Sequence, residues 1–130
     1  MIEFHLDSRS GVPTYLQVVQ QVRQAIRLGI LRPGDQLPTV KEVVSSLTIN
    51  PNTVLHAYRQ LDLEGLVEGR RGVGTFVASA SAPPPPEDLK GLQSSLDRWL
   101  ARARAAGLDD ESIQALFAAA ARSEAEPRVA

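Results

Sequence analysis

The sequence predicts a mostly α-helical α+β fold, made of a compact N-terminal domain with a small β hairpin and a C-terminal two-helix appendage. Apolar residues recur at helical spacing in three stretches before residue 65, and two short β-prone segments broken by glycines follow them. A run of four prolines then interrupts all periodicity. We therefore expect a domain over residues 1–77, a proline-rich linker over 78–86 and the appendage over 87–130.

The first helix is expected over residues 13–28, and Gly29 ends it. Its apolar face is formed by residues three and four positions apart, which are Tyr15, Val19, Val22 and Ile26. A Pro-Gly turn and a short extended segment around residues 36–38 follow.

A second, short helix is expected to begin after Thr39, because Glu42 three residues later completes a T-x-x-E capping box. Asn50 then caps a third helix, with Pro51 at the first helical position, where no amide donor is needed. The buried face of this third helix is expected to consist of Val54, Ala57, Tyr58 and Leu61.

Two strands, over residues 66–69 and 75–77, are expected after Gly65 ends the third helix. The tip that joins them, residues 70–74, contains glycines that allow unusual backbone angles. Three helices, a tight turn between the second and the third, and a two-stranded wing together predict a winged helix-turn-helix. In that fold the start of the third helix reads a DNA major groove, and the wing reaches the backbone or minor groove.

The amino-acid composition excludes several classes of protein. The 130 residues include no cysteine, which excludes disulfides, thiolate catalysis and zinc-thiolate sites. No apolar run approaches the roughly 20 residues of a membrane span, and no export signal is visible, so we expect a cytoplasmic protein without a membrane partner. Residues 1–80 hold eight basic and seven acidic side chains, and the rest hold six and eight, which slightly favours the first domain as the DNA-binding part.

No pattern typical of catalysis is found, so we expect no enzyme, no cofactor and no metal site. His5 and His56 are far apart and have no cysteine or histidine near them in the sequence. The glycines of residues 69–74 lack the lysine and helix start of a phosphate-binding loop. The acidic residues 109–111 open a helix, where negative charge favours the helix dipole.

Five motifs closely resemble the GntR family of bacterial transcription regulators. They are P-x-Y-x-Q (residues 13–17), G-x-L-x-P-G-D-x-L-P (29–38), N-P-N-T-V-x-x-A-Y-x-x-L (50–61), E-G-L-V (64–67) and R-R-G-x-G-T-F-V (70–77). The short remainder resembles that of the YtrA subfamily, in which a two-helix appendage mediates dimerisation. The resemblance implies a regulator of transcription that binds DNA through its winged helix.

Nine residues are candidates for DNA binding: Lys41, Pro51, Asn52, Thr53, His56, Arg59, Arg70, Arg71 and Gly72. Asn52 is suited to adenine and Thr53 to a phosphate or a base edge. By resemblance, Arg71 and Gly72 match the pair that enters the minor groove. Many relatives have arginine at the positions of Lys41 and His56. Lys41 lacks the bidentate geometry of a guanidinium, which leaves a phosphate contact, and the base preference at His56 is open.

Each of these assignments has a plainer alternative. The four basic residues could be solvated surface side chains. Asn50 is better explained as a helix cap than as a base reader. Tyr15 and Tyr58 lie on apolar faces, so we expect them in the core rather than stacked on bases.

The appendage is expected to form two helices, over residues 87–106 and from Asp109 to about residue 123. Two helices alone leave apolar surface uncovered, so we expect a second copy of the chain to cover it. The expected dimer contacts are Leu92, Leu96, Trp99, Leu100, Ile113, Leu116 and Phe117. Docking onto the chain's own winged helix and a ligand cavity beside Trp99 are alternatives.

These features predict a homodimeric repressor that binds an inverted-repeat operator in double-stranded DNA. A winged helix that binds only proteins is the alternative, since the net charge is close to zero. A small-molecule effector at the dimer interface stays open.

Overall fold

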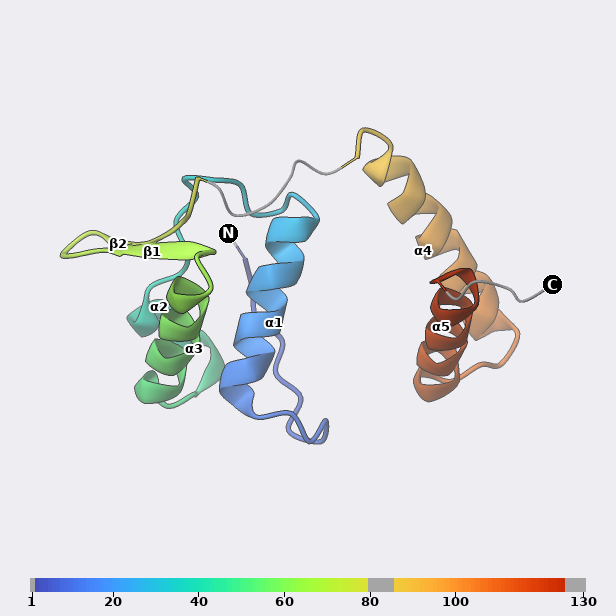
Figure 1. The fold of residues 1–130 in the computed structure, drawn as a ribbon. Helices are drawn as coiled ribbons and strands as arrows, with labels where there is room; N and C mark the ends of the chain where they lie inside the picture. The colour runs from blue at the N-terminus through green and yellow to red at the C-terminus, as the bar shows by residue number, and fades with distance from the viewer. Residues whose placement is uncertain (1, 80–85, 126–130) are drawn as a thin grey trace. The chain divides into compact units, whose positions relative to one another are not determined.

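The computed structural model describes residues 2–79 and 86–125. The chain forms two compact units, residues 1–85 and 86–130 (Figure 1). Most of the expected linker falls on residues 80–85, which lie outside the described residues. The elements are α1 (Thr14–Arg27), α2 (Val40–Leu47), α3 (Pro51–Leu63), β1 (Val67–Arg70), β2 (Gly74–Val77), α4 (Leu89–Ala105) and α5 (Asp110–Ala125). The expected fold class, mostly helical with a small β wing, is confirmed.

The core of the first unit lies between α1, α2 and α3, with α3 in contact with both other helices (Figure 1). Its fully buried apolar side chains come from all three helices, from the wing and from the segment before α2; they include Val18, Val22, Leu37, Val43, Val54, Leu61, Val67 and Val77. The four residues expected on the inner face of α3 are all buried, which confirms the helical spacing. Since the inner face is fully used, the remaining side chains of α3 must face outward.

Both predicted helix caps are present. Glu42 N donates to Thr39 Oγ1 at 3.1 Å, and Thr39 N donates to the Glu42 carboxylate at 3.4 Å, which completes the capping box. Asn50 Oδ1 accepts a hydrogen bond from Asn52 N at 2.8 Å. Between the two helices, Thr48 adopts a left-handed conformation with φ 51°, which is unusual for a β-branched residue and turns the chain sharply.

The wing is an antiparallel pair in which Val67 faces Val77 and Arg70 faces Gly74. Each strand therefore extends one residue further into the expected tip, leaving a turn of residues 71–73. A third segment also bonds to the wing: Leu37 N donates to Thr75 O and Val77 N to Asp35 O, both at 2.8 Å. The segment before α2 thus lies beside β2 and fixes the wing to the helices.

The second unit consists of α4 and α5, joined at Gly107, whose φ of 96° suits glycine. Asp109 Oδ1 accepts from Ser112 N at 2.8 Å, and hydrogen bonding to Ser112 lowers the pKa of the Asp109 carboxyl. The rings of Trp99 and Phe117 lie 5.0 Å apart and connect the two helices. Within residues 2–79 and 86–125, no helix has the length and apolar character needed to cross a membrane.

Candidate nucleic-acid interface

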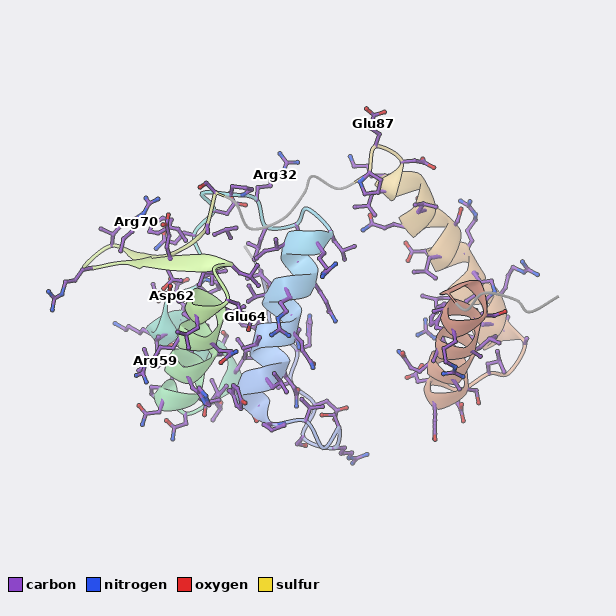
Figure 2. The ribbon with its side chains drawn as sticks, in the orientation of Figure 1. Arg32, Arg59, Asp62, Glu64, Arg70 and Glu87 are labelled. Atoms are coloured by element: carbon purple, nitrogen blue, oxygen red, sulfur yellow. The ribbon has the colours of Figure 1, made fainter. Side chains whose placement is uncertain are left out.

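The outward face of α3 carries three of the predicted side chains. Asn52, His56 and Arg59 are exposed and follow one another at helical spacing on the side opposite the buried face. Thr53 lies at the edge of this face and is half-buried. Figure 2 shows Arg59 on α3 and Arg70 on the wing, on separate elements of the same unit. The start of α3 therefore presents amide, hydroxyl and imidazole groups to a partner.

A buried tyrosine fixes α3 against the segment before α2. Tyr58 Oη donates to the carbonyl oxygen of Pro38 at 2.6 Å, and Tyr58 itself is 7% exposed. Burial, helped by the charge of Glu42, raises the pKa of the Tyr58 hydroxyl well above its usual range. The core role predicted for Tyr58 is confirmed, and its hydroxyl also sets the position of α3.

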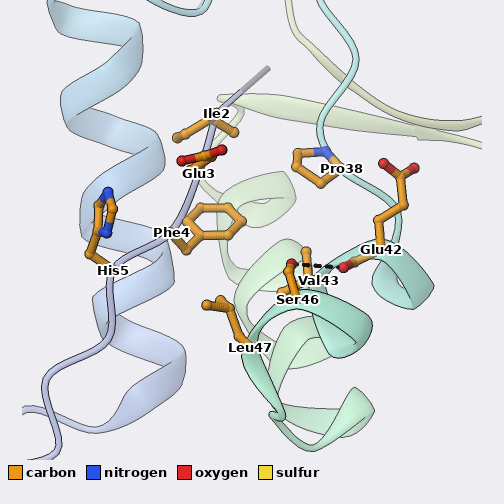
Figure 3. Close-up of a pocket in the computed structure, with 9 residues that line it drawn as sticks. All are labelled: Ile2, Glu3, Phe4, His5, Pro38, Glu42, Val43, Ser46 and Leu47. Atoms are coloured by element: carbon orange, nitrogen blue, oxygen red, sulfur yellow. Dashed lines mark hydrogen bonds between the residues drawn. The ribbon is translucent and has the colours of Figure 1, made fainter.

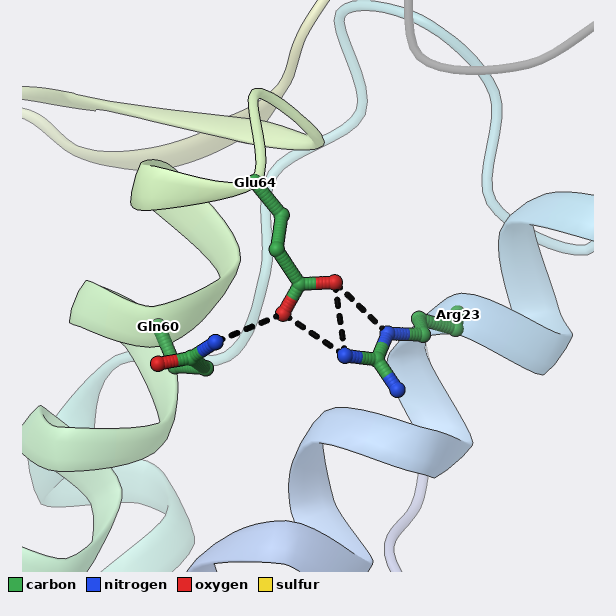
Figure 4. Close-up of polar contacts among 3 residues, drawn as sticks. All are labelled: Arg23, Gln60 and Glu64. Atoms are coloured by element: carbon green, nitrogen blue, oxygen red, sulfur yellow. Dashed lines mark hydrogen bonds and ion pairs between the residues drawn. The ribbon is translucent and has the colours of Figure 1, made fainter.

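An ion pair fixes the C-terminal end of α3 to α1 (Figure 4). The Arg23 guanidinium donates to both Glu64 carboxylate oxygens at 2.8 and 2.7 Å, and Gln60 Nε2 donates to the same carboxylate at 3.1 Å. These contacts lower the pKa of Glu64 and raise that of Arg23, in each case chiefly through their mutual hydrogen bond. Arg23 is therefore occupied within the protein.

A ring stack joins the N-terminal ends of α1 and α3. The Tyr15 and His56 rings lie 3.9 Å apart between centroids, with an angle of 15° between their planes. Tyr15 was expected in the core; it packs against the core only in part, because its ring also covers His56. Sequence reasoning missed this contact, since the two residues are 41 positions apart and no local pattern pairs them.

An open hollow of about 370 Å³ lies at the same place, lined by Thr14, Tyr15, Asn52, Thr53 and His56. The structure thus gathers three predicted DNA-binding residues, Asn52, Thr53 and His56, around one depression. The other candidates lie outside this depression. Pro51 is exposed at the first position of α3, Arg59 is exposed further along the same helix, and Lys41 lies in the first turn of α2. Arg70, Arg71 and Gly72 belong to the wing.

The two wing arginines have different surroundings. Arg70 pairs with Glu68 at 3.4 Å, and its guanidinium lies 4.3 Å from the centre of the Phe76 ring. Arg71 is exposed in the turn, and within the part of the chain that the structure describes no carboxylate lies within ion-pair distance of it. Gly72 beside it has φ 75°, a conformation that favours glycine. Arg71 is therefore the better placed of the two to reach a partner.

A second depression, a groove of about 600 Å³, lies between the N-terminal segment and α2 (Figure 3). Phe4 and Val43 in its lining are buried. The polar groups of α2 here are already engaged: the Glu42 carboxylate belongs to the capping box, and Ser46 Oγ donates to the Glu42 carbonyl at 2.9 Å. This groove shares no residue with the hollow at α3. The described residues contain no group of His, Asp and Glu side chains suited to a metal ion.

The fold and the exposed polar face of α3 define a winged helix-turn-helix DNA-binding protein. Residues 14–77 match the family model of bacterial regulatory proteins of the gntR family. The chain is 35% identical over 109 residues to the HTH-type transcriptional repressor YtrA of Bacillus subtilis. The aligned part covers 83% of this chain and 84% of that protein. The chain belongs to the GntR family, whose members are transcription regulators and not enzymes.

Two solved structures extend the comparison. The structure of YtrA from Sulfolobus acidocaldarius, a GntR-family transcription factor, aligns with a TM-score of 0.55 at 32% identity, covering 75% of this chain and 97% of that one. The DNA-binding domain of AraR in complex with operator ORX1 aligns with a TM-score of 0.53 at 28% identity, covering 59% of this chain and 96% of that one. The shared part includes the winged helix.

Proposed function

We propose that this protein is a homodimeric transcriptional repressor that occupies an inverted-repeat operator. The observation that carries the proposal is the gathering of Asn52, Thr53 and His56 at the start of α3, the end that helix-turn-helix proteins insert into the major groove. Asn50 supplies the helix cap, so the Asn52 side chain is available for the edge of a base. Arg59, one turn further on, and Lys41 on α2 supply charge for phosphates.

The wing supplies the second contact. Arg71 extends from a turn in which Gly72 adopts a left-handed conformation that suits glycine, and strand β2 beyond the turn is hydrogen-bonded to the segment before α2. A single guanidinium at such a tip suits a narrow minor groove, where the negative potential is enhanced. Arg70 adds a phosphate contact when it leaves Phe76 and Glu68.

The appendage supplies the dimer. Leu92, Leu96 and Leu116 are 57%, 44% and 46% exposed, although the pattern of α4 and α5 is that of packed helices. Full burial of one leucine contributes about 1.5–3 kcal/mol, so a second copy gains from covering this face. The same face would also include three half-buried side chains, Trp99, Leu100 and Phe117. Ile113 is 3% exposed, so it packs between α4 and α5 rather than against a second copy.

Similar proteins support the DNA-binding and repressor parts of the proposal. YtrA of Bacillus subtilis carries the name of a transcriptional repressor, and the AraR domain was solved on operator DNA. A protein that acts on a bacterial chromosome works in the cytoplasm. An effector at the dimer interface stays a prediction from the sequence.

The test is selection of bound sequences from random duplex DNA, with the number of chains per duplex measured on the enriched sequence. We expect a palindromic site bound by two chains, with affinity that falls as salt rises. Failure to enrich any sequence at moderate salt would contradict the proposal and favour the protein-binding alternative.

A further inference from the structure

The stack of Tyr15 on His56 places a titratable ring at the centre of the proposed interface. Histidine is the side chain whose ordinary charge change falls between about pH 5 and 8. Neutral imidazole has one N–H donor and one acceptor, whereas the protonated ring has two donors and a positive charge. DNA phosphates and the guanine edge in the major groove present acceptors only, so they favour the protonated ring.

The side chains that surround His56 do not supply a negative charge that would favour the protonated ring. Tyr15 and Thr14 of α1 face it, together with Asn52 and Thr53 of its own helix, and none of these carries a charge near neutral pH. Arg59, one turn along α3, is the charged neighbour on the outward face. Among residues 2–79 and 86–125 no carboxylate lies within ion-pair distance of His56. Within the described residues no negative charge of the protein therefore pairs with a proton on His56, whereas DNA offers such charges.

Hydrogen bonds near Tyr15 hold the start of α1 against the loop that precedes it. Gln17, two residues further along α1, is 8% exposed, and its amide binds the loop before the helix. It accepts from Asp7 N at 2.8 Å and donates to the carbonyl oxygens of Asp7 and Val12 at 2.9 Å. The start of α1 is therefore tied to the loop before it, and the Tyr15 ring lies nearly parallel to the His56 imidazole. A cation held over an aromatic face is also stabilised by it.

We propose that His56 is a proton-dependent DNA contact and that Tyr15 is its positioning residue, so that the operator is bound more tightly as the pH falls from 8 to 5.5. This inference rests on the proposed function. The sign follows from linkage: if the DNA-bound state binds the proton more strongly than the free protein, affinity is highest below the titration range of the free protein and falls as the pH rises through that of the complex.

The experiment measures the dissociation constant for the selected operator at fixed salt between pH 5.5 and 8. The chain has two histidines and no cysteine, so few groups titrate in this range. We expect the parent protein to bind on the order of tenfold tighter per subunit at pH 5.5 than at pH 8. His56→Gln should give a nearly flat profile, while the matched control His5→Gln should keep the parent profile.

Two variants test the role of Tyr15. Tyr15→Phe keeps the stacked ring and should keep the pH dependence, whereas Tyr15→Leu keeps apolar bulk without the ring and should flatten it. Thermal unfolding of each variant shows whether the domain remains folded. As a second readout, the NMR signals of the His56 imidazole should move in the free protein with Tyr15→Leu and less with Tyr15→Phe.

The outcomes separate the two proposals. No operator binding at any pH would overturn the proposed function itself. Operator binding with the same pH profile in parent and His56→Gln would leave the function intact and overturn this inference. If Tyr15→Leu keeps the pH dependence of the parent protein, Tyr15 does not position His56.

Discussion

At the residue scale, Asn50 and Asn52 illustrate how position decides the role of a side chain. The oxygen of Asn50 is used by the backbone N–H of Asn52, so Asn50 closes the helix start while the side chain of Asn52 is left exposed. These roles could be predicted from the sequence because a cap depends on residues a few positions apart. The stack of Tyr15 on His56 could not, because it depends on how α1 packs against α3.

Asn52→Ala should relax base discrimination at one position of each half-site, because a bidentate contact to adenine contributes about 1–3 kcal/mol against the wrong base. The measurement is the affinity for the operator and for single-base variants of it. An equal loss on all sequences would instead make Asn52 a contact to the DNA backbone.

Arg71→Ala should weaken operator binding and lower the slope of log affinity against log salt by about 0.9 for each lost phosphate contact. Arg27→Ala is the matched control, since Arg27 lies at the end of α1 opposite to Tyr15. Titrations of both variants between low and moderate salt provide the measurement. If the two variants behave alike, the wing has no part in binding.

At the scale of elements, the helix caps and the buried helix faces could be predicted from the sequence. For the wing, the two strands could be predicted but their ends could not. The apolar spacing of α3 and the capping box of α2 are local, and both are present. The wing also includes a third segment, residues 34–37, that hydrogen-bonds to β2 from far along the chain. Long-range hydrogen bonds of this kind set the strand ends, and a sequence window does not contain them.

Tyr58→Phe should destabilise the first unit by about 1–3 kcal/mol, because the buried carbonyl of Pro38 loses its donor. The folded state raises the pKa of Tyr58, so the parent should lose stability as the pH rises above the unfolded value of about 10. Denaturant unfolding at pH 8 and above pH 10 measures both effects. The variant should lose less stability with alkali; an equal loss would show that another group is responsible.

At the scale of the whole molecule, the operator recognition that we propose needs two half-sites to be read together. One winged helix reads one half-site, and a second, linked copy binds its half-site at an effective concentration on the order of 1 mM. In the proposed dimer, the apolar face of α4 and α5 thus contributes to operator affinity together with α3. Leu92, Leu96 and Leu116 are exposed on these two helices, and a gathering of exposed apolar residues is typical of an interaction surface.

Leu96→Lys should therefore convert the dimer to a monomer, because a lysine charge at the centre of the apolar face loses its hydration when a second copy packs on it. Sedimentation at low concentration measures the change, and operator affinity should fall by about 10²- to 10⁴-fold as the second contact is lost. Ser94→Lys is the matched control, since Ser94 is exposed on α4 outside the apolar face. Half-site affinity should be unchanged in both variants, because in the proposed complex α3 and the wing make the contacts to each half-site. If Leu96→Lys sediments like the parent, the exposed leucines do not form the interface.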